Sequence, residues 1–374
     1  MGLLDYYRQF DDVQEEELNR ERRARRAEER ALALERVPTI DLSRTEWPDF
    51  PHSEIVNASI SAARGRVNGY PDLHAAGVRE LLASRHGVEP ERIVVGNGAA
   101  ELLLTAALAL LDTGDEVVMP WPSYPLFPLL AQRAGAQPIA VDLAGGGVDC
   151  ETILAAVNDR TRAVVIANPN DPTGTYLRSQ ALAELLRSLP ERVLVLLDEA
   201  YVHFQSVEDE DACLRLTDSC PALLVFRTFS KIYGLSGLRA GYAVGSADAA
   251  PMLTALAPVL GVNVLTQAGV ARALSTGDRE LERRRALVRD ERRRILDALH
   301  YLPVDAPESE ANFVWLSATG LNGAELTGRL ERAGVIVAPG GPLGADDHVR
   351  ATVRSASASD RLLDALQAAT ARPS

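Results

Sequence analysis

Lys231 is the first residue of this sequence to suggest chemistry, because it is the single lysine among 39 basic residues and all the others are arginine. Where only positive charge is needed, arginine can stand in for lysine. A guanidinium cannot lose its proton in a protein, whereas a tuned amine can act as a nucleophile and form a Schiff base. Lys231 is therefore a candidate catalytic amine, with a leftover surface lysine as the alternative.

The neighbours of Lys231 supply further groups that a reactive site would need. The segment RTFSKIYGLSGLRAGY places Thr228 and Ser230 just before the lysine and Arg239 shortly after it. Two hydroxyls and a guanidinium can bind one phosphate, while the amine reacts with an aldehyde. The spacing therefore predicts a site that meets one phosphate and one aldehyde.

Two side chains of the segment DEAY could hold the ring of such a ligand. Asp198 follows the apolar run VLVLL, where an unpaired carboxylate would be costly, so it should face a cation or a ligand nitrogen such as a protonated pyridine. Tyr201 could donate a hydrogen bond to a phenolic oxygen. The segment GNGAAE, residues 96–101, opens a helix after a strand and offers free amides to a phosphate. A dinucleotide site is disfavoured, because Glu101 replaces the last glycine of GxGxxG.

Alternating strands and helices must position these residues. Short β-branched runs such as RIVVGNG, AVVIANPN, RVLVLLDEAY and ALLVFRTFSK alternate with helical stretches. This alternation is typical of an α/β fold with a mostly parallel central sheet and helices on both faces. Ligands bind at the carboxyl ends of such strands. Asn97, Asn168, Asn170, Asp198 and Lys231 all follow strand ends, so we expect the chemistry at one edge of the sheet.

The pattern divides the chain into three parts. Residues 1–45 are expected to form a charged helical arm and the start of a small domain, because acidic and basic residues recur there at the i,i+4 spacing that supports helices. Residues 46–262 should form the large domain that carries the site. Residues 263–374 should complete a smaller α+β domain, which the N- and C-terminal segments build together.

Composition and charge disfavour several classes of protein. A net charge of −13 opposes binding to nucleic acid or to an anionic membrane. No apolar run has the roughly 18 residues of a membrane-spanning helix, and the acidic start does not resemble a secretion signal, so we expect a cytoplasmic protein. Cys150, Cys213 and Cys220 lack metal-ligand spacing, so no metal is expected. The expected partners are small molecules.

The ordered motifs resemble those of the fold type I class I/II aminotransferases, which use pyridoxal 5'-phosphate, and most closely the histidinol-phosphate aminotransferase branch. The resemblance covers roughly residues 40–365. Its motifs follow the family order: NGYPD at 68–72, GNGAAE at 96–101, PSYPLF at 122–127, NPNDPTG at 168–174, DEAY at 198–201, SK at 230–231, GLR at 237–239, then ANF and HVR. Any one motif is a weak signal, but the ordered set is specific.

The resemblance implies a role for each matched residue. Lys231, Asp198 and Tyr201 would be catalytic: Lys231 would carry the cofactor as an imine and move protons at the substrate α-carbon, and Asp198 would keep the pyridine nitrogen protonated. Arg350 would bind the substrate carboxylate. The other implied contacts are Tyr124 on the ring, Asn170 and Tyr201 at its phenolic oxygen, Gly98, Ala99, Ala100, Thr228, Ser230 and Arg239 at the phosphate, Asn312 at the substrate, and Tyr70 reaching across from a second subunit.

The implied function is that of a homodimeric aminotransferase with ping-pong chemistry. An amino acid or amine, such as one resembling histidinol phosphate, would give its nitrogen to the cofactor, and a 2-oxo acid would take it away. A decarboxylase of the threonine-phosphate decarboxylase type shares nearly all these motifs and is one alternative. A cofactor-binding regulator without turnover is a second.

Three positions depart from the pattern of the resembled family. Asp171 stands directly before PTG, where the family usually has Asn, so either Asn170 or Asp171 could meet the cofactor. Gly69 stands where the histidinol-phosphate branch commonly has Arg before Tyr-Pro. Ala338 occupies a position where that branch often has an Arg for the substrate phosphate. These departures bear on the substrate and not on the fold.

Overall fold

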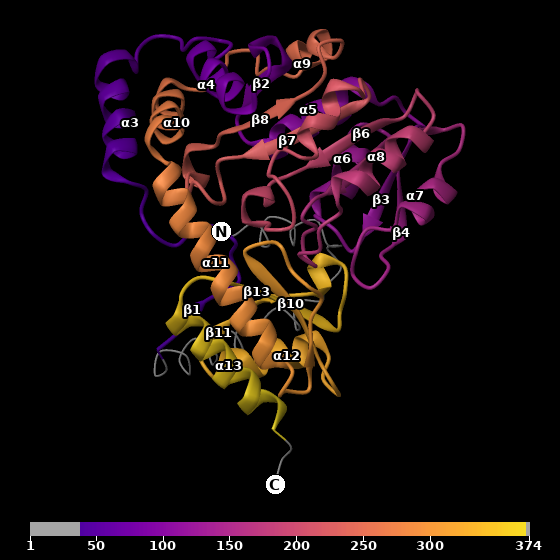
Figure 1. Cartoon of the computed structure of the whole chain (residues 1–374), viewed down its shortest axis with the longest axis vertical. Helices are drawn as coiled ribbons and strands as arrows, with labels where there is room; N and C mark the ends of the chain where they lie inside the picture. Colours follow the sequence, from indigo (N-terminus) through magenta and orange to yellow (C-terminus); the bar gives the residue numbers. More distant parts are fainter. Residues whose placement is uncertain (1–37, 372–374) are drawn as a thin grey trace, which may run out of the picture.

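A seven-stranded sheet forms the centre of the larger part of the molecule, in a computed structural model that describes residues 38–371 (Figure 1). Its strand order is β2-β8-β7-β6-β5-β3-β4. All neighbouring strands are parallel except at β8, which runs antiparallel to both β2 and β7. The strands are β2 (Ile93–Gly96), β3 (Glu116–Trp121), β4 (Gln137–Asp142), β5 (Thr161–Ala167), β6 (Leu194–Asp198), β7 (Leu223–Thr228) and β8 (Gly241–Val244).

Both faces of this sheet are covered, and the alternation of side chains along each strand explains why. In β6, Leu196 belongs to one apolar cluster, whereas Val195 and Leu197 belong to another on the opposite face. Helices pack over these faces and around the sheet edges. They are α3 (Ser53–Arg66), α4 (Ala76–His86), α5 (Ala99–Leu110), α6 (Leu126–Arg133), α7 (Cys150–Ala156), α8 (Ser179–Ser188), α9 (Ala250–Ala255) and α10 (Val264–Thr276).

The smaller part combines the start of the described chain with its C-terminal third. A four-stranded antiparallel sheet has the order β12-β13-β10-β9, and β1 (Ile40–Asp41) pairs in parallel with β11 (Val335–Ile336). The four strands are β9 (Val304–Asp305), β10 (Phe313–Ala318), β12 (Ala338–Pro339) and β13 (His348–Thr352), and the helices are α11 (Asp278–Leu299), α12 (Gly323–Arg332) and α13 (Ala356–Thr370). Short 3₁₀ turns occur at Pro90–Arg92, Val202–Phe204, Leu214–Asp218, Ser236–Leu238 and Gly341–Leu343.

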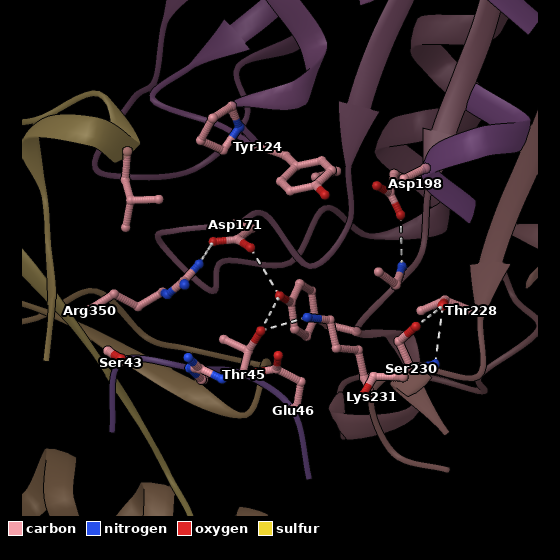
Figure 2. Close-up of a pocket in the computed structure, with 18 of the residues that line it drawn as sticks. Ser43, Thr45, Glu46, Tyr124, Asp171, Asp198, Thr228, Ser230, Lys231 and Arg350 are labelled. Carbon is pink, nitrogen blue, oxygen red and sulfur yellow. Dashed lines mark hydrogen bonds and ion pairs between the residues drawn. The ribbon is translucent and has the colours of Figure 1, made fainter. Parts of the chain in front are cut away.

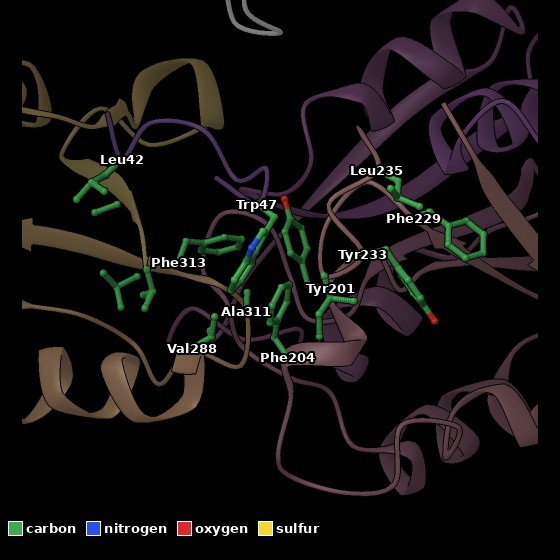
Figure 3. Packing of buried hydrophobic residues seen from close by; sticks show 14 of the residues in the cluster. Leu42, Trp47, Tyr201, Phe204, Phe229, Tyr233, Leu235, Val288, Ala311 and Phe313 are labelled. Atoms are coloured by element: carbon green, nitrogen blue, oxygen red, sulfur yellow. The ribbon is translucent and has the colours of Figure 1, made fainter. Parts of the chain in front are cut away.

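An aromatic cluster joins the two parts beside the ends of the central strands. Tyr201 of the large part packs edge-to-face on Phe313 of β10, with ring centres 5.0 Å apart. Trp47 and Phe204 lie in the same buried cluster (Figure 3). The guanidinium of Arg284, on α11, covers the Trp47 ring at 4.6 Å. The long helix α11 runs from the larger part to the smaller one (Figure 1) and contacts α10 as well as α13.

The expected fold class, α/β with a mostly parallel central sheet and a smaller α+β unit, is confirmed. The expected boundary after residue 262 stays a prediction, since α10 lies beyond it yet contacts α3 and α4. Most of the expected charged arm, residues 1–37, lies outside the described residues. In the part of the chain that the structure describes, no helix is long and apolar enough to cross a membrane.

Candidate active site

A pocket lies where the carboxyl ends of three central strands meet the start of α5. Ala167, Asp198 and Thr228 line it from the ends of β5, β6 and β7. The smaller part supplies the opposite wall, including Arg350 of β13 and the segment 43–46 that follows β1 (Figure 2). Parallel strands therefore gather the expected chemistry at one edge, as the sequence predicts.

Lys231 projects into this pocket from the loop after β7. Its Nζ donates a 2.5 Å hydrogen bond to Thr45 Oγ1 and lies 5.0 Å from the centre of the Tyr201 ring (Figure 2). Burial lowers the pKa of the Lys231 amine from 10.5 to about 8, because the ammonium form loses its hydration. The amine is thus much closer to its neutral, nucleophilic form than a surface lysine at neutral pH.

Asp198 ends β6 with its carboxylate in the pocket. Its Oδ1 accepts a 3.0 Å hydrogen bond from the Ala200 amide, and burial raises the pKa of the carboxyl from 3.8 to about 7. Among the described residues, no basic side chain forms an ion pair with it. A buried carboxylate of this kind is stabilised by a cationic ligand nitrogen, which is the role that the sequence predicts.

The start of α5 and the loop after β7 form an anion-binding corner. Ala99 and Ala100 occupy the first helical positions, where backbone amides have no intrahelical partner. Arg239 Nη1 lies 3.3 Å from Ser230 Oγ, which in turn accepts from Thr228 Oγ1 at 3.0 Å. This corner suits a phosphate, because the start of α5, the two hydroxyls and the Arg239 guanidinium lie together.

Gly98 shapes the anion corner without lining the pocket itself. It caps α5 with φ +105°, a conformation that favours glycine. A Cβ atom here would lie 2.6 Å from Arg239 Nη2. Gly98 therefore allows the guanidinium to approach the helix end closely, which supports its expected place in phosphate binding.

Tyr201, Asp171 and Arg350 form a chain of contacts across the pocket. Tyr201 Oη donates to Asp171 Oδ2 at 2.9 Å and lies 3.1 Å from Thr45 Oγ1. Arg350 Nη1 donates to the other carboxylate oxygen, Asp171 Oδ1, in a short ion pair. Burial raises the pKa of Tyr201 well above 10, so its hydroxyl stays protonated and able to donate.

Of the two candidates for the cofactor contact before PTG, Asp171 lines the pocket and Asn170 does not. The Asn170 amide points away from the pocket: its Nδ2 donates to Thr173 Oγ1 and to the Pro122 carbonyl, and its Oδ1 accepts from Ser123. Asp171, the next residue, lines the pocket in its place. These hydrogen bonds of the Asn170 side chain hold the loop that presents Asp171.

Asn312 also serves the site indirectly. Its Nδ2 donates to the Thr45 carbonyl at 3.0 Å, and the residue does not line the pocket. Tyr70 is 81% exposed and lies outside the pocket of its own chain. The remaining expected residues all line the pocket: Ala99, Ala100, Tyr124, Asp198, Tyr201, Thr228, Ser230, Lys231, Arg239 and Arg350.

A buried ionic network supports the strand ends from behind. Arg227 Nε donates to Glu199 Oε2 at 2.8 Å, and its Nη1 donates to Asp211 Oδ1 at 2.6 Å. Arg227 and Glu199 are both fully buried. Because they directly neighbour Thr228 and Asp198 in the chain, this ion pair fixes the backbone from which two pocket residues project.

Thr45 is a site residue that the sequence interpretation missed. It follows a short edge strand and carries no motif, so only its contact with Lys231 reveals it. Asp171 could be singled out from the sequence, because it stands directly before PTG where the family usually has Asn. The sequence did not show which residues it contacts. In residues 38–371 no cluster of His, Cys, Asp or Glu could hold a metal ion.

The comparison with known families decides the identity of the chain. The family described as "Aminotransferase class I and II" matches residues 37–366. This chain belongs to the class I and II aminotransferases. Histidinol-phosphate aminotransferase 2 of Carboxydothermus hydrogenoformans is 36% identical to this aminotransferase over 346 residues, covering 91% of this chain and 92% of that one. An aromatic amino acid aminotransferase of Corynebacterium efficiens is 37% identical over 331 residues, covering 88% and 93%.

A solved relative connects the fold of this aminotransferase to its cofactor. The crystal structure of histidinol-phosphate aminotransferase from Sinorhizobium meliloti in complex with pyridoxal 5'-phosphate superposes with a TM-score of 0.80 at 26% identity, covering 92% of this chain and 94% of that one. The expected family and cofactor are thus confirmed. The pocket fits this cofactor: Lys231 offers an amine, Asp198 a carboxylate without a basic partner among the described residues, and the α5 corner a phosphate site.

Proposed function

We propose that this aminotransferase moves amino groups between an amino acid with an uncharged, apolar side chain and a 2-oxo acid, with pyridoxal phosphate held at Lys231. The observation that carries the choice of substrate is an apolar wall of the pocket, which the smaller part of the molecule supplies. Ile336, Val337, Pro339 and Leu343 line it from β11, β12 and the turn that follows. An apolar wall of this kind favours an aliphatic or aromatic side chain.

The same wall lacks the groups that a phosphorylated amine would need. Ala338, between Val337 and Pro339, is fully buried and pairs in register with Arg350. Arg44, a basic residue that also lines the pocket, is largely exposed and lies 3.8 Å from Asp41. Glu46 and Glu331 line the pocket as well and would repel a phosphate. We therefore favour the aromatic amino acid type over the histidinol-phosphate type.

The side chains of the pocket divide the work of the reaction. The cofactor supplies an electron sink for the carbanion that proton loss from the substrate creates. Asp198 holds the ring nitrogen protonated, and the amides of Ala99 and Ala100 with Arg239 orient the phosphate. Lys231 Nζ, with its pKa lowered to about 8, takes and returns the proton at the α-carbon. Arg350 aligns the substrate by its carboxylate.

A homodimer is part of this proposal. Tyr70 is exposed, and so are apolar side chains close to it in the chain and in the loop after α9: Val67, Leu73, Val259 and Leu260. Gly261 lies against Leu73, which brings this loop beside the segment that carries Tyr70. A second copy seated here would cover the apolar surface and receive Tyr70 at its own pocket.

Substrate choice is tested by mixing the purified, cofactor-loaded protein with single amino donors and following the loss of visible absorption by the cofactor. Phenylalanine or leucine should react with a kcat/KM at least about tenfold above that of histidinol phosphate, a factor that apolar pockets typically supply. Lys231→Ala should lose both the reaction and the absorption band of the imine between the cofactor and Lys231. A preference for histidinol phosphate would contradict the proposed substrate, and an active Lys231→Ala variant would contradict the mechanism.

The shared site is tested by subunit complementation. Lys231→Ala and Tyr70→Ala proteins should each be nearly inactive, while a reassorted mixture should recover about one quarter of the wild-type activity, because half of the dimers are hybrids with one intact site. A mixture that stays inactive, or a monomer in sedimentation, would oppose the shared site.

A further inference from the structure

The Asp171–Arg350 ion pair lies at the point where a substrate carboxylate is expected to bind. Asp171 is 4% exposed, and both of its oxygens have partners: Oδ1 accepts from Arg350 Nη1 and Oδ2 from Tyr201 Oη. Arg350 is buried too, with its guanidinium 5.3 Å from the centre of the Phe313 ring. A buried charge pair of this kind interacts strongly because water screens it little.

Asp171 cannot easily turn away from the guanidinium. The Gly174 amide donates to the Asn170 carbonyl at 2.7 Å, and the Asn170 amide donates to the Thr175 carbonyl at 2.9 Å, so the loop is closed on itself. The Asn170 side chain ties the same loop to Pro122 and Ser123. Arg350 projects from the paired strand β13. Both partners therefore stand on rigid backbone, and the ion pair bridges the two parts of the molecule.

The charged residues that line the pocket show how Asp171 affects the charge available to a substrate. The basic lining residues are Arg44, Lys231, Arg239 and Arg350, and the acidic ones are Glu46, Asp171, Asp198 and Glu331. Lys231, Asp198 and Arg239 serve the cofactor in the function proposed above. Of the charges that remain to face a substrate, Asp171 is the one in direct contact with Arg350, the expected carboxylate ligand.

We propose that Asp171 is a specificity-determining residue: an internal counter-ion that shares Arg350 with the substrate and thereby weakens the binding of carboxylates. A neutral amide at this position would leave the full guanidinium charge to the ligand. With Asp171 present, the substrate carboxylate binds an Arg350 guanidinium whose charge is already compensated. The bound carboxylate also lies close to the negative charge of Asp171, which repels it. The pocket therefore admits one carboxylate weakly and selects against substrates with a second anionic group.

This inference rests on the proposed use of Arg350, and it is tested by ligand binding to the cofactor-loaded protein, independently of turnover. The probes are 3-phenylpropionate and its uncharged amide, 3-phenylpropionamide, titrated by calorimetry. Asp171→Asn should lower the Kd for 3-phenylpropionate by at least about tenfold, since one nearby negative charge is removed. The Kd for 3-phenylpropionamide should stay within about twofold of the wild-type value. Asp171→Ala should tighten the carboxylate as well, although it removes the hydrogen bonds.

Glu331→Gln is the matched control, because it removes a charge from the same pocket and, among the described residues, the ion pair of Arg350 is with Asp171 and not with Glu331. It should change the carboxylate affinity much less than Asp171→Asn. Equal carboxylate affinity in wild type and Asp171→Asn, weaker binding in Asp171→Asn, or no binding by either protein would overturn the inference. Turnover of phenylalanine by the wild type tests the proposed function separately. A failure of the binding experiment can therefore be told apart from a failure of the proposed function.

Discussion

Lys231 Nζ donates a hydrogen bond of 2.5 Å to Thr45 Oγ1, which places the only lysine of the chain against the segment that follows the first strand. Thr45 Oγ1 also lies 3.1 Å from Tyr201 Oη, and the Thr45 carbonyl accepts from Asn312 Nδ2. The Thr45 hydroxyl thus contacts both Lys231 and Tyr201, two parts of the chain that are distant from it in sequence. Its hydrogen bond with Lys231 bears directly on the protonation of the amine.

Thr45→Val should shift the pH dependence of cofactor capture. Burial holds the pKa of Lys231 at about 8, so the neutral amine, which attacks an aldehyde, becomes dominant as the pH rises through that value. The Thr45 hydroxyl accepts from the ammonium and so favours the charged form. Its loss should lower the midpoint by about one pH unit, the equivalent of one hydrogen bond to a charged group. The rate of pyridoxal phosphate binding by cofactor-free protein, followed by absorbance, measures this shift.

Thr327→Val is the control for that experiment. Thr327 lines the same pocket, but its hydroxyl donates to the Gly323 carbonyl within α12 and does not contact Lys231. Its midpoint should match that of the wild type. A Thr45→Val midpoint equal to the wild-type value, or one moved to higher pH, would show that the hydroxyl does not stabilise the ammonium.

Asp198→Ala should retain the cofactor but lose most of the rate. Burial raises the pKa of this carboxyl to about 7, and a protonated ring nitrogen would return it to its charged form. Without that charge the ring is a weaker electron sink, and kcat should fall at least about 100-fold, as for other preorganised electrostatic contacts. Asp198→Asn separates charge from shape and should be similarly slow. Single-turnover kinetics with wild-type rates would rule out this role.

Gly98→Ala should weaken cofactor binding. The added Cβ would meet Arg239 Nη2 at 2.6 Å, and φ +105° is strained for alanine, so the phosphate corner must shift. We expect the Kd for pyridoxal phosphate to rise by at least about tenfold, the equivalent of 1.4 kcal/mol. Gly77→Ala in α4, where nothing lies within 4 Å, is the control and should bind normally. Equal affinity of the two variants would contradict the close approach.

Arg227→Met should destabilise the fold strongly. It would leave Glu199 as a fully buried carboxylate without its ion-pair partner, and breaking a buried pair in this way lowers the free energy of unfolding by about 3–5 kcal/mol. Chemical denaturation measures the loss. The double variant Arg227→Met, Glu199→Met should recover part of it, because the fully buried Glu199 carboxylate is then absent, while Asp211 keeps its contact with His86. A fully additive double variant would mean that the pair is not coupled.

Site residues could be predicted from the sequence where a charged or reactive residue directly follows a buried strand. Asp198 and Lys231 follow buried strands, and strand ends of a parallel sheet meet at one edge, so their proximity follows from the sequence pattern. The family resemblance implied Asn170 at the cofactor and left Asp171 as the alternative. The Asn170 side chain forms hydrogen bonds within its own loop, and Asp171 lines the cavity. Neighbouring residues of a tight loop point in different directions, and the sequence does not encode which one faces the cavity.

By itself, the sequence determined the α/β class, the reactive amine and the family, since alternation, residue chemistry and motif order are all local properties of the chain. Only the tertiary structure decided that Thr45 contacts Lys231, that Asp171 pairs with Arg350 and that the wall near Ala338 is apolar. These contacts join residues that are far apart in the chain, and which side chains meet there depends on how the smaller part packs against the larger one.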